Sequence, residues 1–166
     1  MTTPSHFLRR SLCLLLALCG AATTQSEPLP KNWRAQHWRD IGPYTYNLRE
    51  ADAVELHRFE DSPEAKEPED PSKMKIVDTK RFTGAEAARI AQLWRDQDWV
   101  GFGASCHEPV YGITFYRGDQ KLFFGSICFG CQNVYLYGGK TDTAGFNRES
   151  RAYPVLRSLF KEIWGQ

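Results

Sequence analysis

One long stretch, residues 111–139, is rich in aromatic and β-branched residues and reads YGITFYRGDQKLFFGSICFGCQNVYLYGG. Such residues favour strands, and the Gly118-Asp119 pair is typical of a tight turn between antiparallel strands. A third strand is expected to follow over residues 133–138. This stretch therefore predicts an antiparallel sheet.

The position of the turn predicts which residues of the hairpin face each other. A turn centred on the Gly-Asp pair places Ile113 opposite Phe124 and Phe115 opposite Leu122. Large apolar side chains would then share one face of the sheet, which is the arrangement that stabilises a hairpin.

Two more strands and two helices are expected outside the hairpin. The strands are predicted over residues 53–59 and 74–82, and apolar residues recur at helical spacing over 83–99 and 150–164. Residues 29–50 have no clean period and are expected to be irregular. The predicted fold class is α+β, an antiparallel sheet of about four to five strands with two helices packed on one face.

The N-terminus has the layout of a secretory signal peptide, predicted over residues 1–24. Arg9 and Arg10 precede an apolar run over residues 12–18, which is about half the ~20 residues of a membrane-spanning helix. No transmembrane segment is expected, and a lipid anchor at Cys19 is a lesser alternative. The prediction is an exported protein, periplasmic or secreted, whose residues 25–166 form a single domain.

The charge of the chain is balanced, with 21 basic and 20 acidic residues. Nucleic-acid binders carry a basic stripe or a block of lysine and arginine. No such block stands out in the sequence, so a nucleic-acid partner is not expected. A protein or small-molecule partner stays open.

Three cysteines of the expected domain, Cys106, Cys128 and Cys131, are the candidate site. The hairpin register brings Cys106 opposite Cys131 if both arms stay extended. In an oxidising compartment the simplest expectation is one bridge, from Cys106 to Cys128 or Cys131, and one free thiol. The bridge would act as a staple.

The same sulfurs are open to two other chemistries, zinc binding and dithiol redox. A zinc ion would need a fourth ligand, and His107 points to the opposite face from its neighbour Cys106 if the backbone is extended. A redox dithiol at the Cys-x-x-Cys pair lacks the helix N-terminus that normally activates it. Zinc is therefore an alternative whose ligand set is incomplete, and otherwise no cofactor is expected.

The same region carries two secondary candidates, His107 and Tyr111. A cysteine nucleophile needs a base within hydrogen-bond reach, and a histidine cannot easily serve its own neighbour. No catalytic residues are predicted.

The runs CHEPVYGITFY and SICFGCQNVY resemble a group of small, mostly bacterial, uncharacterised proteins. That group has a Cys-x-x-Pro segment, a Gly-Ile strand, a turn and an Ile-Cys-aromatic-x-Cys strand. The resemblance spans residues 87–136 and touches Cys106, Pro109, Gly112, Ile113, Ile127, Cys128, Phe129 and Cys131. An Arg-His pair often occupies the positions of Val110 and Tyr111 in the group, so an activity of that pair would be missing here. The resemblance marks a site and implies no known reaction.

Together these observations predict an exported, non-catalytic domain with a binding or structural role, stapled by a disulfide. The alternative is a thiol-redox or zinc site at the same cysteines.

Overall fold

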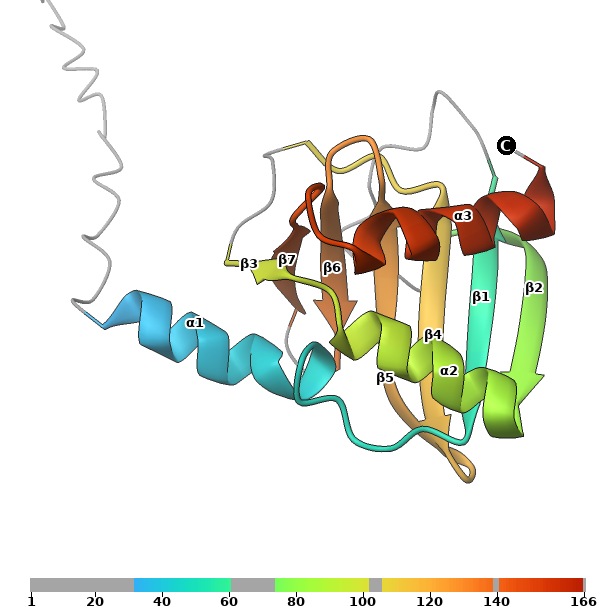
Figure 1. Ribbon diagram of the computed structural model, residues 1–166, viewed down its shortest axis with the longest axis horizontal. Helices are drawn as coiled ribbons and strands as arrows, with labels where there is room; N and C mark the ends of the chain where they lie inside the picture. Colours follow the sequence, from blue (N-terminus) through green and yellow to red (C-terminus); the bar gives the residue numbers. More distant parts are fainter. Residues whose placement is uncertain (1–31, 61–73, 102–105, 139–140, 166) are drawn as a thin grey trace, which may run out of the picture. The chain divides into compact units, whose positions relative to one another are not determined.

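A computed structural model describes residues 32–60, 74–101, 106–138 and 141–165 (Figure 1). The predicted signal peptide and the alternative lipid anchor at Cys19 lie outside the described residues. The elements are α1 (Trp33–Ile41), the 3-10 helix η1 (Gly42–Tyr44), β1 (Ala53–Phe59), β2 (Ile76–Thr83), α2 (Gly84–Arg95), β3 (Trp99–Val100), β4 (Tyr111–Arg117), β5 (Gln120–Cys128), β6 (Asn133–Tyr137), β7 (Thr141–Phe146) and α3 (Ala152–Trp164).

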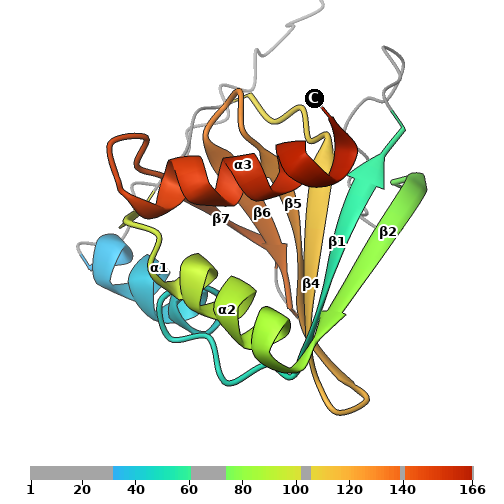
Figure 2. The same cartoon turned by 45° about the vertical axis from the view of Figure 1, so that its right-hand side comes forward.

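The strands form one antiparallel sheet of seven in the order β2-β1-β4-β5-β6-β7-β3. Helices α2 and α3 lie on one face of this sheet, as Figures 1 and 2 show. No described helix covers the opposite face, which we call the open face. It is formed by alternate residues of the central strands, including Glu55, His57, Phe59, Gly112, Thr114, Tyr116, Phe124, Ser126, Tyr135 and Tyr137.

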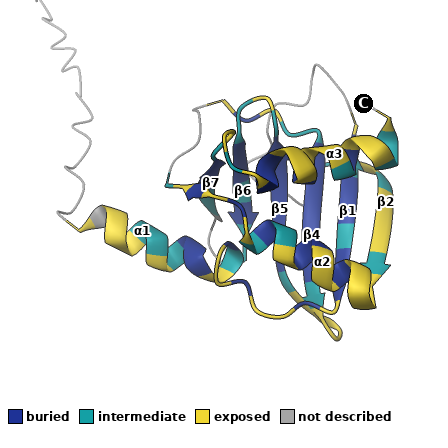
Figure 3. Ribbon diagram, in the orientation of Figure 1, coloured by how far each residue is buried: buried dark blue, intermediate teal, exposed yellow. Residues whose placement is uncertain are grey.

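The hydrophobic core lies between the sheet and the two helices (Figure 3). Helix α2 buries four apolar residues at i, i+3, i+4 and i+7, the spacing of one helical stripe, and its Trp94 ring contacts Phe115 and Phe123. Helix α3 contributes Phe160, whose ring contacts Tyr111. The alternation of the strands supplies the other half of this core.

The predicted sheet of four to five strands with two helices was wrong, because in the described residues the sheet has seven strands and three α-helices accompany it. Strand β7 escaped prediction because its sequence, TDTAGF, contains few strand-forming residues. Strand β3 has two residues, too few to give a period. Helix α1 lies in the segment that was expected to be irregular, and its sequence has only a weak apolar stripe.

The predicted hairpin register was also wrong over most of its length. Arg117 pairs with Gln120, as the turn predicts, but an irregularity between Phe115 and Tyr116 shifts the pairing by one residue. Phe115 therefore faces Phe123, while Phe124 points to the open face. A bulge inserts one residue, and a shift of one residue exchanges the two faces of a strand.

In the parts of the chain that the structure describes, no helix is long and apolar enough to cross a membrane.

Candidate functional site

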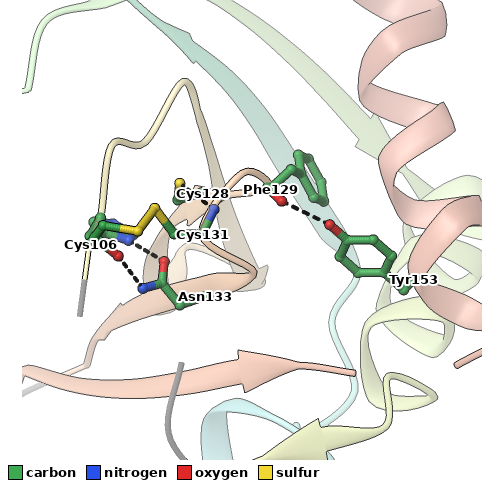
Figure 4. Close-up of a disulfide and its surroundings, with 7 residues drawn as sticks. Cys106, Cys128, Phe129, Cys131, Asn133 and Tyr153 are labelled. Carbon is green, nitrogen blue, oxygen red and sulfur yellow. Dashed lines mark hydrogen bonds between the residues drawn. A yellow bond between two sulfur atoms is a disulfide. The ribbon is translucent and has the colours of Figure 1, made fainter. Parts of the chain in front are cut away.

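The predicted cysteine cluster contains one disulfide bond, between Cys106 and Cys131 (Figure 4). Their Cα atoms are 5.9 Å apart, within the range that disulfides require. Cys128 is a free thiol and is buried. The expectation of one bridge and one free thiol is confirmed, and of the two connectivities left open the structure has Cys106–Cys131.

The prediction that an extended hairpin brings Cys106 opposite Cys131 was wrong, although the two residues are bonded. Strand β4 begins at Tyr111, and residues 106–110 are not part of the ladder. Cys131 lies in the turn between β5 and β6. The two half-cystines therefore meet outside the sheet.

His107 is the second residue that fixes segment 106–110 to the sheet. Its Nδ1 lies 2.7 Å from Asn133 Oδ1, and its Nε2 lies 2.7 Å from Ser126 Oγ. The imidazole also stacks on the Tyr135 ring, with centroids 3.9 Å apart and 9° between the planes. Segment 106–110 is thus held to the open face by a histidine as well as by a disulfide.

The hydrogen bonds define the state of this histidine. Asn133 Nδ2 donates to the Cys106 carbonyl at 2.6 Å, so Asn133 Oδ1 is the acceptor for His107. Nδ1 must therefore carry the proton, and the Ser126 hydroxyl donates to Nε2. Burial lowers the pKa of His107, and the hydrogen bond to Asn133 opposes that effect in part. The ring is neutral at pH 7.

A serine, a histidine and an amide in this order are the components of a nucleophilic triad. In this protein, however, Ser126 has no exposed surface and His107 is only 7% exposed. The Tyr135 ring covers the imidazole. A nucleophile needs room for a substrate within about 3 Å, and this cluster is closed. The geometry therefore supports a structural role, and we call His107, Ser126, Asn133 and Tyr135 the buried clamp.

Sequence reasoning missed Ser126, Asn133 and Tyr135 as members of this cluster. A signal for two of them was present, because a serine and an asparagine interrupt a run of strand-forming residues. Buried polar side chains need hydrogen-bond partners, so such interruptions indicate a polar network.

The other secondary candidate, Tyr111, is not part of the cluster. It faces the helix-covered side and stacks on Trp164, with ring centroids 5.7 Å apart. Burial raises the pKa of its hydroxyl. Tyr111 and His107 therefore lie on opposite faces of the sheet.

A second buried histidine, His57, lies on the open face. Its Nδ1 is 2.9 Å from Thr79 Oγ1, its Nε2 is 2.8 Å from Thr114 Oγ1, and its ring contacts Phe124. Burial lowers its pKa. The open face thus buries two neutral imidazoles without help from a described helix.

The described residues contain no group of three or more histidine, cysteine or acidic side chains placed to hold a metal ion. The sulfurs of Cys106 and Cys131 are joined to each other, and zinc binds thiolates. A zinc site would therefore require the reduced protein.

Comparison of the chain with protein-family models, curated proteins and solved structures gives no match. The resemblance of the cysteine motif to a bacterial family stays a prediction.

Proposed function

We propose that this chain is an exported, non-catalytic binding domain in which the Cys106–Cys131 bridge is a staple. The proposal rests on one observation, namely that the reactive groups of the cluster are buried and hydrogen-bonded within the protein. The Ser126 hydroxyl and the His107 imidazole are hydrogen-bonded to each other, and the Cys128 side chain is 3% exposed. Groups arranged in this way stabilise a loop.

The open face is the proposed contact surface. A sheet face that meets water is normally lined with polar residues, whereas this one carries four aromatic side chains, of which Phe59 and Phe124 are buried beside Tyr135 and Tyr137. The two tyrosines are half-buried, so part of each side chain reaches the surface. Aromatic residues are enriched where proteins bind partners, because they bury a large area with few rotatable bonds.

Export is supported by the layout of residues 1–24 and by the disulfide, which persists in oxidising compartments. The test is the intact mass of the protein recovered from the export compartment, with and without thiol alkylation under denaturing conditions. We expect loss of the leader, one bridge and one free thiol that is alkylated under the denaturing conditions. A full-length chain with three reduced thiols in residues 25–166 would refute both export and stapling.

The contact surface is tested separately by site-specific photo-crosslinking in the same compartment. A photoreactive phenylalanine analogue replaces Tyr137 on the open face in one variant and Val155 on the helix side in a matched control. Val155 is 50% exposed, so it is at least as accessible as the test position. A discrete adduct at position 137 that is absent at 155 is expected. Equal labelling at both positions would argue against a dedicated surface.

A thiol-redox or zinc site at the same three cysteines is the alternative proposal. One observation favours the thiol form, namely that the free Cys128 sulfur accepts a hydrogen bond from the backbone N–H of Cys131 at 3.1 Å. Reduced protein that binds zinc stoichiometrically would favour the metal form.

A further inference from the structure

We infer that the three sulfurs form an internal thiol–disulfide exchange site, in which Cys128 can displace Cys106 from its bond to Cys131. The inference concerns the chemistry of the cluster and does not depend on the proposed binding role.

The Cys128 sulfur lies close to the half-cystine that it would attack. The 3.1 Å hydrogen bond places the Cys128 sulfur against the backbone of the residue whose side chain is bridged. Figure 4 draws Cys128 together with the disulfide and with the backbone nitrogen of Cys131 that donates to its sulfur. Cys128 is the last residue of β5, and Cys131 follows it after two residues, within the turn between β5 and β6.

The exchange has a defined direction. The Cys128 thiolate attacks Cys131 Sγ, a Cys128–Cys131 bond forms, and the Cys106–Cys131 bond breaks. Cys106 leaves as a thiolate and takes up the proton that Cys128 lost, so no external oxidant or reductant is consumed. Cys106 is the exposed member of the three, and water stabilises a departing thiolate.

The contacts that hold segment 106–110 on the sheet do not involve the bond that breaks. After exchange, His107 would still be bonded to Asn133 and Ser126, and Asn133 would still hold the Cys106 carbonyl. The segment would remain on the sheet while a buried thiol is replaced by an exposed one. The site would therefore present Cys106 as a reactive thiol toward small disulfides and alkylating agents.

The experiment uses the oxidised protein at pH 8 without reductant, treated with iodoacetamide, quenched with acid and digested with trypsin. Residues 96–117 and 122–140 form two tryptic peptides. The Cys106–Cys131 bridge joins these peptides, whereas a Cys128–Cys131 bridge lies inside the second. We expect a growing fraction of separate peptides, with Cys106 alkylated and the second peptide internally bridged.

Two variants make the test decisive. In Cys128→Ala, alkylation of Cys106 should be at least ~10-fold slower, since no internal attacker remains. In Cys106→Ala, oxidised glutathione should produce the Cys128–Cys131 bridge, with loss of two hydrogens in mass. Wild-type protein that yields only joined peptides would overturn the inference, as would equal Cys106 labelling in Cys128→Ala. Folding of each variant is checked by circular dichroism, and the wild-type result stands without them.

Discussion

The buried amide of Asn133 holds the clamp together, and its replacement by alanine is the most direct test of the site. The side chain is 1% exposed, accepts a hydrogen bond from His107 Nδ1 and donates one to the Cys106 carbonyl. Asn133→Ala removes both bonds and leaves the imidazole N–H facing a small cavity. The native state should therefore lose free energy relative to the unfolded chain.

The expected loss follows from the two orphaned groups. A buried donor left without a partner costs about 1–3 kcal/mol, and His107 is such a group. The Cys106 carbonyl belongs to an exposed residue, so water can replace its bond at a net cost of about 0.5–1.5 kcal/mol. The free energy of unfolding should fall by about 1.5–4.5 kcal/mol in total.

Urea denaturation monitored by tryptophan fluorescence gives this number, with Asn147→Ala as the matched control. Asn147 also donates a side-chain bond, 2.6 Å to Asp98, but that pair is exposed, so its loss should cost less than about 1 kcal/mol. Nitrogen-15 spectra of the histidine ring provide a second measurement, in which wild-type His107 should show the Nδ1–H tautomer. Equal destabilisation by the two variants, or an Nε2–H tautomer in the wild type, would refute the reasoning.

Three further outcomes are expected. The double change Cys106→Ala/Cys131→Ala opens a bridge with a sequence separation of 25 and should lower the free energy of unfolding by about 3–3.5 kcal/mol in urea; a loss below about 1 kcal/mol would contradict the staple. Burial lowers the pKa of both His57 and His107 below 6.5, so the unfolded chain binds more protons below that value. Stability should be complete above about pH 6.5 and fall as the pH drops toward 5, by up to ~1.4 kcal/mol per pH unit for each ring, and a flat profile would show that the rings are not buried as neutral groups. Gly112→Ala would place a methyl carbon 2.7 Å from a phenylalanine ring carbon on the open face, and thermal unfolding should show a loss of about 1–3 kcal/mol, whereas an unchanged melting temperature would mean that the rings are free to move.

The parts of the fold that could be predicted are those in which apolar or strand-forming residues recur at the spacing of a helix or a strand. Helices α2 and α3 have apolar residues at helical spacing, and the β4–β5 hairpin has strand formers around a turn. Strand β7 and helix α1 lack such a pattern. Packing against neighbouring elements stabilises them, and their own sequences do not predict that packing. Tyr44, next to α1, donates a hydrogen bond to the Gly138 carbonyl 94 residues away, a contact that no local pattern predicts.

The hairpin shows how one local irregularity changes a site. The shift between Phe115 and Tyr116 moves Phe124 from the expected core to the open face, where its ring lies against His57. It also places Ser126 opposite Gly112, on the face that His107 covers. Local strand propensities do not reveal a bulge that is stabilised by contacts between residues distant in sequence. The cysteines could therefore be predicted as a cluster, but the hydrogen-bonded clamp beside them could not.

On the open face, aromatic rings cover the two buried histidines. Tyr135 stacks on His107, and Phe124 lies against His57. Phe124 is buried, whereas Tyr135 is half-buried, so Tyr135 is both the cover of an imidazole and part of the proposed contact surface. A ring that keeps water from a neutral histidine lowers its pKa, and a ring that faces a partner contributes area to binding. The two roles compete for the same atoms. A partner that displaced Tyr135 would hydrate His107 and loosen the segment that carries Cys106, whereas a partner that packed over the ring would strengthen the clamp. Binding at this face should therefore change the pH dependence of stability, with a sign that distinguishes the two modes of contact.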